Sequence, residues 1–227
     1  MKIVLFGATG MVGQGVLREC LLDPNVEMVQ TVGRSPGGVR DPKLREIVHQ
    51  DLFHYSEIEA QLAGFDACFF CLGVSSAGMS ESQYENLTYT LTLAAAETLA
   101  RLNPQMTFVY VSGAGTDSSE QGRIMWARVK GRTENALLRL PFKAAYMFRP
   151  GVIIPTHGER SKTAAYRIGY AVARPLLPLL RRFFPRHILT TEQIGLAMIR
   201  VAKYGAPKKF LEAPDIAACA GSQAPEN

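Results

Sequence analysis

The chain has 227 residues, 47% of them hydrophobic, a length and composition typical of one sizeable folded domain that exclude disorder throughout. The formal net charge of +5 is concentrated between Glu159 and His187, a segment that contains seven basic residues and one acidic residue. Since the remainder is close to neutral, the charge excludes a general nucleic-acid-binding composition, and we expect no nucleic-acid partner.

Strand-like and helix-like segments alternate along the first 150 residues. The short apolar run Ile3–Phe6 is typical of a parallel strand covered on both faces, and the amphipathic helix after it starts at Met11 and ends near Pro24. Further strands are predicted at Val26–Val32, around Ile47–Val48, and at Ala67–Leu72, Thr107–Val111 and Ala145–Phe148. Further helices are predicted at Ile58–Leu62, from the capping box Ser80-x-x-Gln83 to Leu102, and at Arg123–Arg139. The alternation predicts an α/β fold with a Rossmann-type doubly wound parallel sheet.

The pattern changes after Pro155, where we expect a short C-terminal substrate-side region. A helical stretch is predicted at Ala164–Ala173, a helix from the capping box Thr190-x-x-Gln193 to Tyr204, and a strand at Phe210–Leu211. We interpret residues 1–216 as a single domain, with residues 152–190 as a lid over the substrate and residues 217–227 as a frayed tail.

A glycine-rich loop lies directly between the first strand and the first helix. The spacing G-x-x-G-x-x-G suits a tight turn, close approach of a pyrophosphate to backbone N–H groups, and tight packing of a helix on the sheet. The helix N-terminus would add partial positive charge, and the alternative is a merely tight turn. The loop residues predicted to contact the phosphates are Gly7, Thr9, Gly10, Met11, Val12 and Gly13.

The end of the second strand indicates which dinucleotide is bound. An NAD site usually has an acidic residue there for the ribose 2′-hydroxyl, whereas this chain has Arg34 and Ser35 after Gly33. Arg34 can pair with a 2′-phosphate, which favours NADP(H), although it could also be an ordinary surface arginine. Asp51 and Leu52, which follow the third strand, are predicted to lie beside the adenine.

Two cysteines form a C-x-x-C pattern that can indicate a redox or metal site. Cys68 and Cys71 lie in a predicted strand, so their side chains should point to opposite faces, and no second ligand pair lies nearby. We interpret them as core residues. The histidines are scattered (His49, His54, His157 and His187), so no metal site is predicted.

Several motifs together resemble the atypical short-chain dehydrogenase/reductases. Besides the glycine loop they are Gly33-Arg34, Asp51-Leu52, Cys71-Leu72-Gly73, Tyr110-Val111-Ser112, Arg128-Val129-Lys130-Gly131 and Phe148-Arg149-Pro150-Gly151. The resemblance extends from residue 1 to about 216. It is nearest to the NAD(P)-dependent epimerase and NmrA-like branches, close to the subgroup that includes the Tat-interacting oxidoreductase-like protein.

The resemblance implies roles for individual residues. Ser112 would polarise a substrate carbonyl, and Lys130 would bind the nicotinamide ribose and assist proton transfer. Leu72 and Gly73 would line the ribose. The residues expected beside the nicotinamide are Pro150, Gly151 and Val152. These roles imply an oxidoreductase that uses NADP(H) and an unidentified small-molecule substrate.

One residue departs from the family's pattern. Trp126 stands four residues before Lys130, where the family has the tyrosine that supplies a proton. An indole N–H is only a hydrogen-bond donor. Lys130 could act as the acid itself, or Tyr110 could donate, and Tyr146 and His157 are weaker candidates. The alternative function is therefore a noncatalytic NADP(H)-sensing regulator.

The basic segment leaves a third alternative, a membrane-associated accessory protein. The simpler interpretation is that this segment forms part of the lid. Because Pro175 and Pro178 prevent one long amphipathic helix, we do not expect membrane contact. A homodimer is left open. The apolar run at Ile3–Phe6 is too short for a signal peptide, so we expect a cytoplasmic protein.

Overall fold

Seven parallel strands form the central sheet of the computed structural model, which describes residues 1–159 and 188–221. The strands are β1 (Lys2–Phe6), β2 (Met28–Gly33), β3 (Leu44–Val48), β4 (Ala67–Phe70), β5 (Thr107–Val111), β6 (Ala144–Arg149) and β9 (Phe210–Glu212). Their order across the sheet is β3-β2-β1-β4-β5-β6-β9. The predicted Rossmann-type doubly wound sheet is therefore confirmed.

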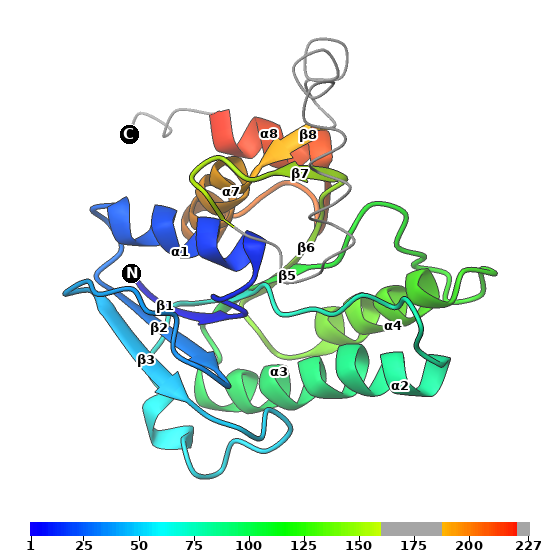
Figure 1. Cartoon of the computed structure of the whole chain (residues 1–227), viewed down its shortest axis with the longest axis horizontal. Helices are drawn as coiled ribbons and strands as arrows, with labels where there is room; N and C mark the ends of the chain where they lie inside the picture. The colour runs from blue at the N-terminus through cyan, green and yellow to red at the C-terminus, as the bar shows by residue number, and fades with distance from the viewer. Residues whose placement is uncertain (160–187, 222–227) are drawn as a thin grey trace.

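Helices cover both faces of this sheet (Figure 1). One face carries α1 (Met11–Leu22), α7 (Thr191–Tyr204) and α8 (Ala213–Gly221), and the other carries α2 (Glu81–Glu85), α3 (Leu91–Leu102) and α4 (Met125–Arg139). Along β1, Ile3 and Leu5 pack into the core beneath α1 and α7, whereas Val4 and Phe6 pack into the core beneath α3. All four side chains are fully buried, which explains the continuous apolar run of this strand.

Both predicted capping boxes are present. The Gln83 backbone N–H donates to Ser80 Oγ at 3.3 Å, and the Gln193 backbone N–H donates to Thr190 Oγ1 at 3.0 Å. The long helix that begins after Ser80 is not regular, because the π-helical segment η2 (Asn86–Thr90) separates α2 from α3. Sequence periodicity could not predict this single widened turn.

Other elements also differ from the sequence prediction. The short helix expected around residues 58–62 is one 3₁₀ turn, η1 (Glu59–Gln61). Two short strands, β7 (Val152–Ile154) and β8 (Ile188–Thr190), pair in parallel and were not predicted as a pair. Residues 217–221, expected to be frayed, belong to α8. The helix predicted at Ala164–Ala173 lies outside the described residues, and no helix within them is long and apolar enough to cross a bilayer.

Helices α1 and α7 cross at two glycines. A β-carbon on Gly15 would lie 2.5 Å from the Cβ of Thr191, and one on Gly195 would lie 2.7 Å from the Cγ of Glu19. Neither Gly15 nor Gly195 can therefore carry a side chain, because the Thr191 and Glu19 side chains of the opposite helix fill the space.

The strand order reverses direction between β1 and β4. The chain proceeds from β1 to β2 and β3 on one side and then returns to β4 on the other. In open parallel sheets of this kind, the crevice at the carboxyl ends of the two strands around the reversal is the usual ligand site. The turns after Phe6 and Phe70 lie at this crevice.

Candidate functional site

Two glycines of the loop are so tightly packed that neither can carry a side chain. Gly7 has a φ of +79°, and a β-carbon there would lie 2.6 Å from the Cys71 carbonyl carbon and the Leu72 nitrogen. A β-carbon on Gly13 would lie 2.1 Å from the Gly7 carbonyl oxygen. Both glycines are therefore required for the turn from β1 into α1 to pack against the end of β4.

The first turn of α1 has no side-chain cap. Gly10 is the N-cap residue, and its own N–H donates to the Gly7 carbonyl at 2.9 Å. The first bond of the helix runs from the Gln14 N–H to the Gly10 carbonyl at 2.8 Å. The N–H groups of Met11, Val12 and Gly13 therefore have no acceptor within the helix, and this turn contains no acidic residue. Such a helix end suits an anion.

Arg34 and Ser35 are exposed at the carboxyl end of β2. The Arg34 backbone carbonyl accepts a hydrogen bond from Gln50 at 2.9 Å, while no ion pair within the described part of the chain engages its guanidinium group. The neighbouring acid, Asp51, is turned toward its own loop, because its carboxylate accepts from His54 Nδ1 at 2.7 Å and from the Phe53 N–H at 2.9 Å. The bond from His54 is the main reason that the pKa of Asp51 is lowered.

Three other predicted positions, Leu52, Leu72 and Gly73, differ in how far they are exposed to solvent. Leu52 is buried in the core beneath α3 rather than open to solvent. Leu72 is half-buried and Gly73 exposed directly after β4. These two lie on the turn that contacts Gly7. In the glycine loop itself, the Thr9 backbone carbonyl accepts a hydrogen bond from the Gln14 side chain at 3.0 Å.

The segment after β6 is hydrogen-bonded to the segment after β5. The Ser112 N–H donates to the Phe148 carbonyl at 2.8 Å, and the Ala114 N–H donates to the Pro150 carbonyl at 2.9 Å. Gly151 and Val152, which follow Pro150, are exposed. The residues predicted to lie beside the nicotinamide are thus held next to the loop that carries Ser112.

Lys130 is close to Ser112, but it bonds to its backbone. The Lys130 Nζ donates to the Ser112 carbonyl oxygen at 2.6 Å and lies 5.8 Å from the centre of the Tyr110 ring. Burial lowers the pKa of the Lys130 ammonium group to about 8, an effect that the nearby Glu134 carboxylate partly offsets. A lysine with such a pKa can exchange a proton near neutral pH.

The Ser112 hydroxyl is engaged inside the protein. It donates to Glu134 Oε1 at 2.5 Å, and the Phe148 carbonyl lies 3.1 Å away. The predicted action of this hydroxyl on a substrate carbonyl would therefore require the bond to Glu134 to break. Sequence reasoning missed Glu134, which is fully buried, and its partner Arg149. The only signal was the four-residue spacing from Lys130 to Glu134, which puts both on one face of α4.

Other tyrosines do not replace the residue missing at Trp126. Burial raises the pKa of Tyr110, so this phenol is a poor proton donor. The Tyr146 hydroxyl accepts from the Ala206 N–H at 3.1 Å, in the core on the α7 side of the sheet. His157 lies 3.4 Å from a carboxylate oxygen of Glu192, which is likewise on the α7 side.

The two cysteines of the C-x-x-C pattern point to opposite faces of β4 and its extension. Cys68 is buried in the core beneath α3, and Cys71 packs against the core beneath α1. No group of three or more potential metal ligands occurs among the described residues.

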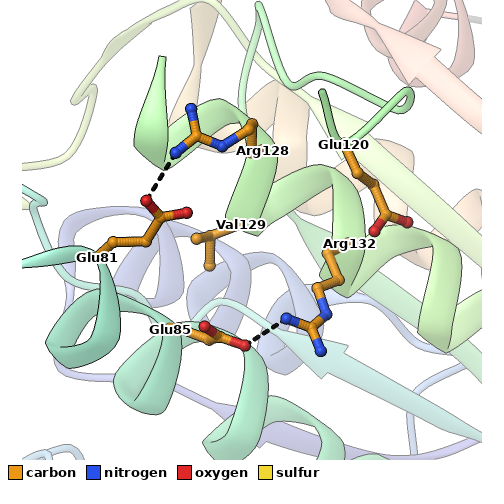
Figure 2. Close-up of a pocket in the computed structure, with 6 residues that line it drawn as sticks. All are labelled: Glu81, Glu85, Glu120, Arg128, Val129 and Arg132. Atoms are coloured by element: carbon orange, nitrogen blue, oxygen red, sulfur yellow. Dashed lines mark hydrogen bonds and ion pairs between the residues drawn. The ribbon is translucent and has the colours of Figure 1, made fainter. Parts of the chain in front are cut away.

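A separate pocket of about 170 Å³ lies between α2 and α4 (Figure 2). Ion pairs cross it from Glu81 to Arg128, at 2.7 Å, and from Glu85 to Arg132. It contains none of the residues predicted to bind the dinucleotide, and its charges are largely paired with one another.

Comparison with named proteins identifies several fungal relatives, whereas no protein-family model matches the chain. The chain is 30% identical over 180 residues to protein fmp52, mitochondrial, of Emericella nidulans, covering 76% of this chain and 73% of that protein. It is 29% identical over 161 residues to protein FMP52-2, mitochondrial, of Scheffersomyces stipitis, covering 70% and 67%. Because these relatives are consistently named as mitochondrial, the prediction of a cytoplasmic protein is wrong.

Solved structures share the fold at low sequence identity. The Bordetella bronchiseptica enzyme WbmF, solved with NAD⁺ and UDP, has a TM-score of 0.68 and 15% identity, covering 96% of this chain and 75% of that one. An oxidoreductase of the short-chain dehydrogenase/reductase family from Burkholderia thailandensis has a TM-score of 0.65 and 14% identity, covering 96% and 92%. The fold is therefore that of short-chain dehydrogenase/reductases and epimerases, without singling out the NmrA-like branch.

Proposed function

The chain belongs to the FMP52 family, and we propose that it is an oxidoreductase that binds NADP(H) at the carboxyl ends of β1, β2 and β4. The observation that supports this most directly is the loop from Gly7 to Gly13. Its first and last glycines, Gly7 and Gly13, leave no room for a side chain, and its helix begins with N–H groups that have no partner within the helix. Both features suit a pyrophosphate.

The preference for NADP(H) over NAD(H) depends on Arg34. Its guanidinium group is exposed and forms no ion pair within the described residues, and Ser35 next to it adds a hydroxyl donor. Asp51, the acid on the neighbouring loop, is occupied by His54 and Phe53. A 2′-phosphate would pair with Arg34 through charge-assisted hydrogen bonds.

The proposed chemistry assigns proton transfer to Lys130. A bound reduced nicotinamide supplies a hydride. The Lys130 ammonium group keeps two N–H donors beyond the one on the Ser112 carbonyl, and these can bind a ribose hydroxyl or the substrate oxygen. With a pKa of about 8, Lys130 can give a proton to an oxygen that gains charge during reduction and recover it from water.

The proposed substrate class follows from the lack of a good proton donor in the site. Trp126 cannot supply a proton, and Tyr110 is a poor donor because of its raised pKa. Acceptors whose reduced form is stabilised by conjugation need less help from an acid. We therefore propose quinones and enones as the substrates to test first.

A second candidate function is a noncatalytic NADP(H) sensor, which Trp126 specifically favours. In this case binding would persist without turnover of any carbonyl. Turnover of even one quinone or enone by the unmodified chain at a rate proportional to enzyme concentration would exclude this candidate.

Calorimetric titration with NADPH, NADP⁺, NADH and NAD⁺ tests the proposal. We expect NADPH to bind more tightly than NADH, and Arg34→Ala to weaken NADPH binding by about tenfold or more while leaving NADH unchanged. Arg139→Ala is the matched control, because it removes the same charge at the far end of α4. Equal affinities for NADPH and NADH, or no binding of any form, would contradict the proposal.

A further inference from the structure

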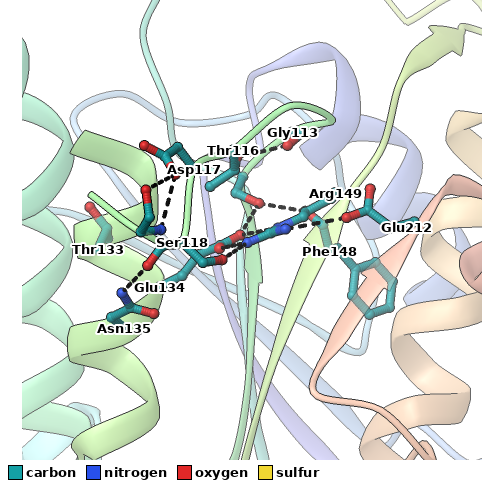
Figure 3. Close-up of polar contacts among 12 residues, drawn as sticks. Gly113, Thr116, Asp117, Ser118, Thr133, Glu134, Asn135, Phe148, Arg149 and Glu212 are labelled. Atoms are coloured by element: carbon teal, nitrogen blue, oxygen red, sulfur yellow. Dashed lines mark hydrogen bonds and ion pairs between the residues drawn. The ribbon is translucent and has the colours of Figure 1, made fainter. Parts of the chain in front are cut away.

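A buried ion pair lies one helical turn from Lys130. The Glu134 side chain is completely buried, and that of Arg149 is 11% exposed. Arg149 Nε donates to Glu134 Oε1 at 3.0 Å, and the same carboxylate oxygen accepts from the Ser112 hydroxyl at 2.5 Å. Figure 3 shows Arg149 extended between Glu134 on α4 and Glu212 on β9.

Arg149 connects several elements through one side chain. Its Nη2 donates to Ser118 Oγ at 2.5 Å, and its Nη1 donates to Glu212 Oε1 at 3.3 Å. Its guanidinium carbon lies 4.6 Å from the centre of the Phe210 ring. Burial acts to lower the pKa of Arg149, but the bonds to Glu134 and Glu212 outweigh it and raise the pKa.

The pair holds one loop at two points. Ser112, bonded to Glu134, begins the loop between β5 and α4, and Ser118, bonded to Arg149, lies in its middle part. The Ser112 carbonyl oxygen is the acceptor for the Lys130 ammonium group. The position of Lys130 therefore depends on the same loop that the pair holds.

Stability alone is a weak reason for such a pair. Removing two charges from water costs free energy that their attraction often does no more than repay, and well-packed apolar residues of the same volume are frequently as stable. What apolar residues cannot do is fix two serine hydroxyls by directional hydrogen bonds.

We propose that the Glu134–Arg149 pair is a positioning device that holds the β5–α4 loop so that the Ser112 carbonyl fixes Lys130 at the nicotinamide end of the site. This inference rests on the proposed function, because it assumes that Lys130 contacts the nicotinamide half of the dinucleotide. Neither residue of the pair is expected to touch the ligand itself.

Two ligands distinguish a loss of Lys130 positioning from a general loss of structure. NADPH would reach both the glycine loop and Lys130, whereas 2′,5′-ADP contains only the adenine half with its 2′-phosphate. The test measures both dissociation constants for the wild-type chain, Arg149→Met and Ser112→Ala. The control is Arg132→Met on the same helix, which breaks the ion pair with Glu85 at the pocket of Figure 2 and leaves the loop untouched.

We expect Arg149→Met and Ser112→Ala to weaken NADPH binding, the former by about tenfold, because a charge-assisted hydrogen-bond network is lost. Binding of 2′,5′-ADP should be unchanged in both variants, and Arg132→Met should bind both ligands as the wild type does. If the variants lose both affinities equally, or neither, the pair has no positioning role. If the wild type binds neither ligand, the proposed function itself is overturned.

Arg149→Met leaves the Glu134 carboxylate buried without its partner, and the variant could fail to fold. Ser112→Ala then carries the test, since it removes a single hydroxyl and leaves the ion pair intact. An unchanged ratio of the two dissociation constants in folded Ser112→Ala would overturn the proposal.

Discussion

The carbonyl oxygen of Asp117 lies only 1.7 Å from the position that a β-carbon on Gly131 would occupy. The β5–α4 loop therefore rests directly on the backbone of α4, one residue after Lys130. The Asp117 N–H also donates to the Ala127 carbonyl at 3.1 Å, which holds the loop on the same helix. Any side chain at residue 131 must push the loop away.

Gly131→Ala is expected to destabilise the chain by about 1–3 kcal/mol, the usual cost of overpacking, because the added methyl group meets backbone that cannot rotate aside. Urea unfolding measures this change. Gly221→Ala is the control and should have little effect, because no other described part of the chain outside its own helix and chain neighbours lies within 4 Å of the added carbon. Equal stability of the two variants would mean that the loop does not rest on α4.

Alanine substitutions in the glycine loop should differ in severity. Gly13→Ala places a carbon 2.1 Å from the Gly7 oxygen, whereas Gly10→Ala places one 3.3 Å from the same atom. We expect Gly13→Ala to abolish NADPH binding and Gly10→Ala to reduce it moderately, as measured by calorimetry. The reverse order would contradict the geometry of this turn.

Lys130 should make stability depend on pH in a defined window. Below about pH 8 the folded and unfolded chains both carry its proton, but between pH 8 and the ordinary lysine range only the unfolded chain does. The free energy of unfolding of the wild type, relative to Lys130→Met, should therefore rise with pH in that window. The charged or titratable groups near Lys130 are Glu134 on α4 and Tyr110 on β5.

Urea unfolding of both chains at several pH values from 7 to about 10 measures this difference. Subtracting Lys130→Met removes the contributions of all other groups that titrate alike in the two chains. A difference that stays constant or falls with pH would show that burial does not lower the pKa of Lys130.

Trp126→Tyr should add the proton donor that the family pattern contains and this chain lacks. General acid catalysis typically contributes about 10²–10⁴-fold, so NADPH-dependent reduction of simple ketones and aldehydes should appear or increase. Trp126→Phe is the control, since it changes the ring without adding a hydroxyl. Reduction assays at neutral pH check the prediction, and identical rates for the two variants would contradict it.

The parts of the fold that sequence could predict are those set by local chemistry. The glycine turn, the two capping boxes and the buried strands each leave a signature within a few neighbouring residues. The pairing of β7 with β8 joins two three-residue segments far apart in the chain, and such short strands have no readable period. The π-helical turn at Asn86–Thr90 is likewise invisible in a helical pattern.

In the candidate site, too, local features could be predicted from the sequence and contacts between distant residues could not. The positions of Gly7 and Gly13 followed from the motif, because steric crowding is a property of the turn itself. The partner of the Ser112 hydroxyl did not, since strand alternation gives the face but not the atom that a side chain meets there. Glu134 was missed because a carboxylate on a helix is ordinarily solvated, and the groups that compensate its burial, Arg149 and the Ser112 hydroxyl, lie on other parts of the chain.

The glycine crossing of α1 and α7 constrains how this chain can diverge. Neither Gly15 nor Gly195 can accept even a methyl group without displacing Thr191 or Glu19, so each position requires glycine for its own reason. A larger residue at either one would tilt the helix whose first turn follows the Gly7–Gly13 loop. Glycine should thus be retained at both positions of the crossing, and variation among homologues should collect elsewhere on these helices.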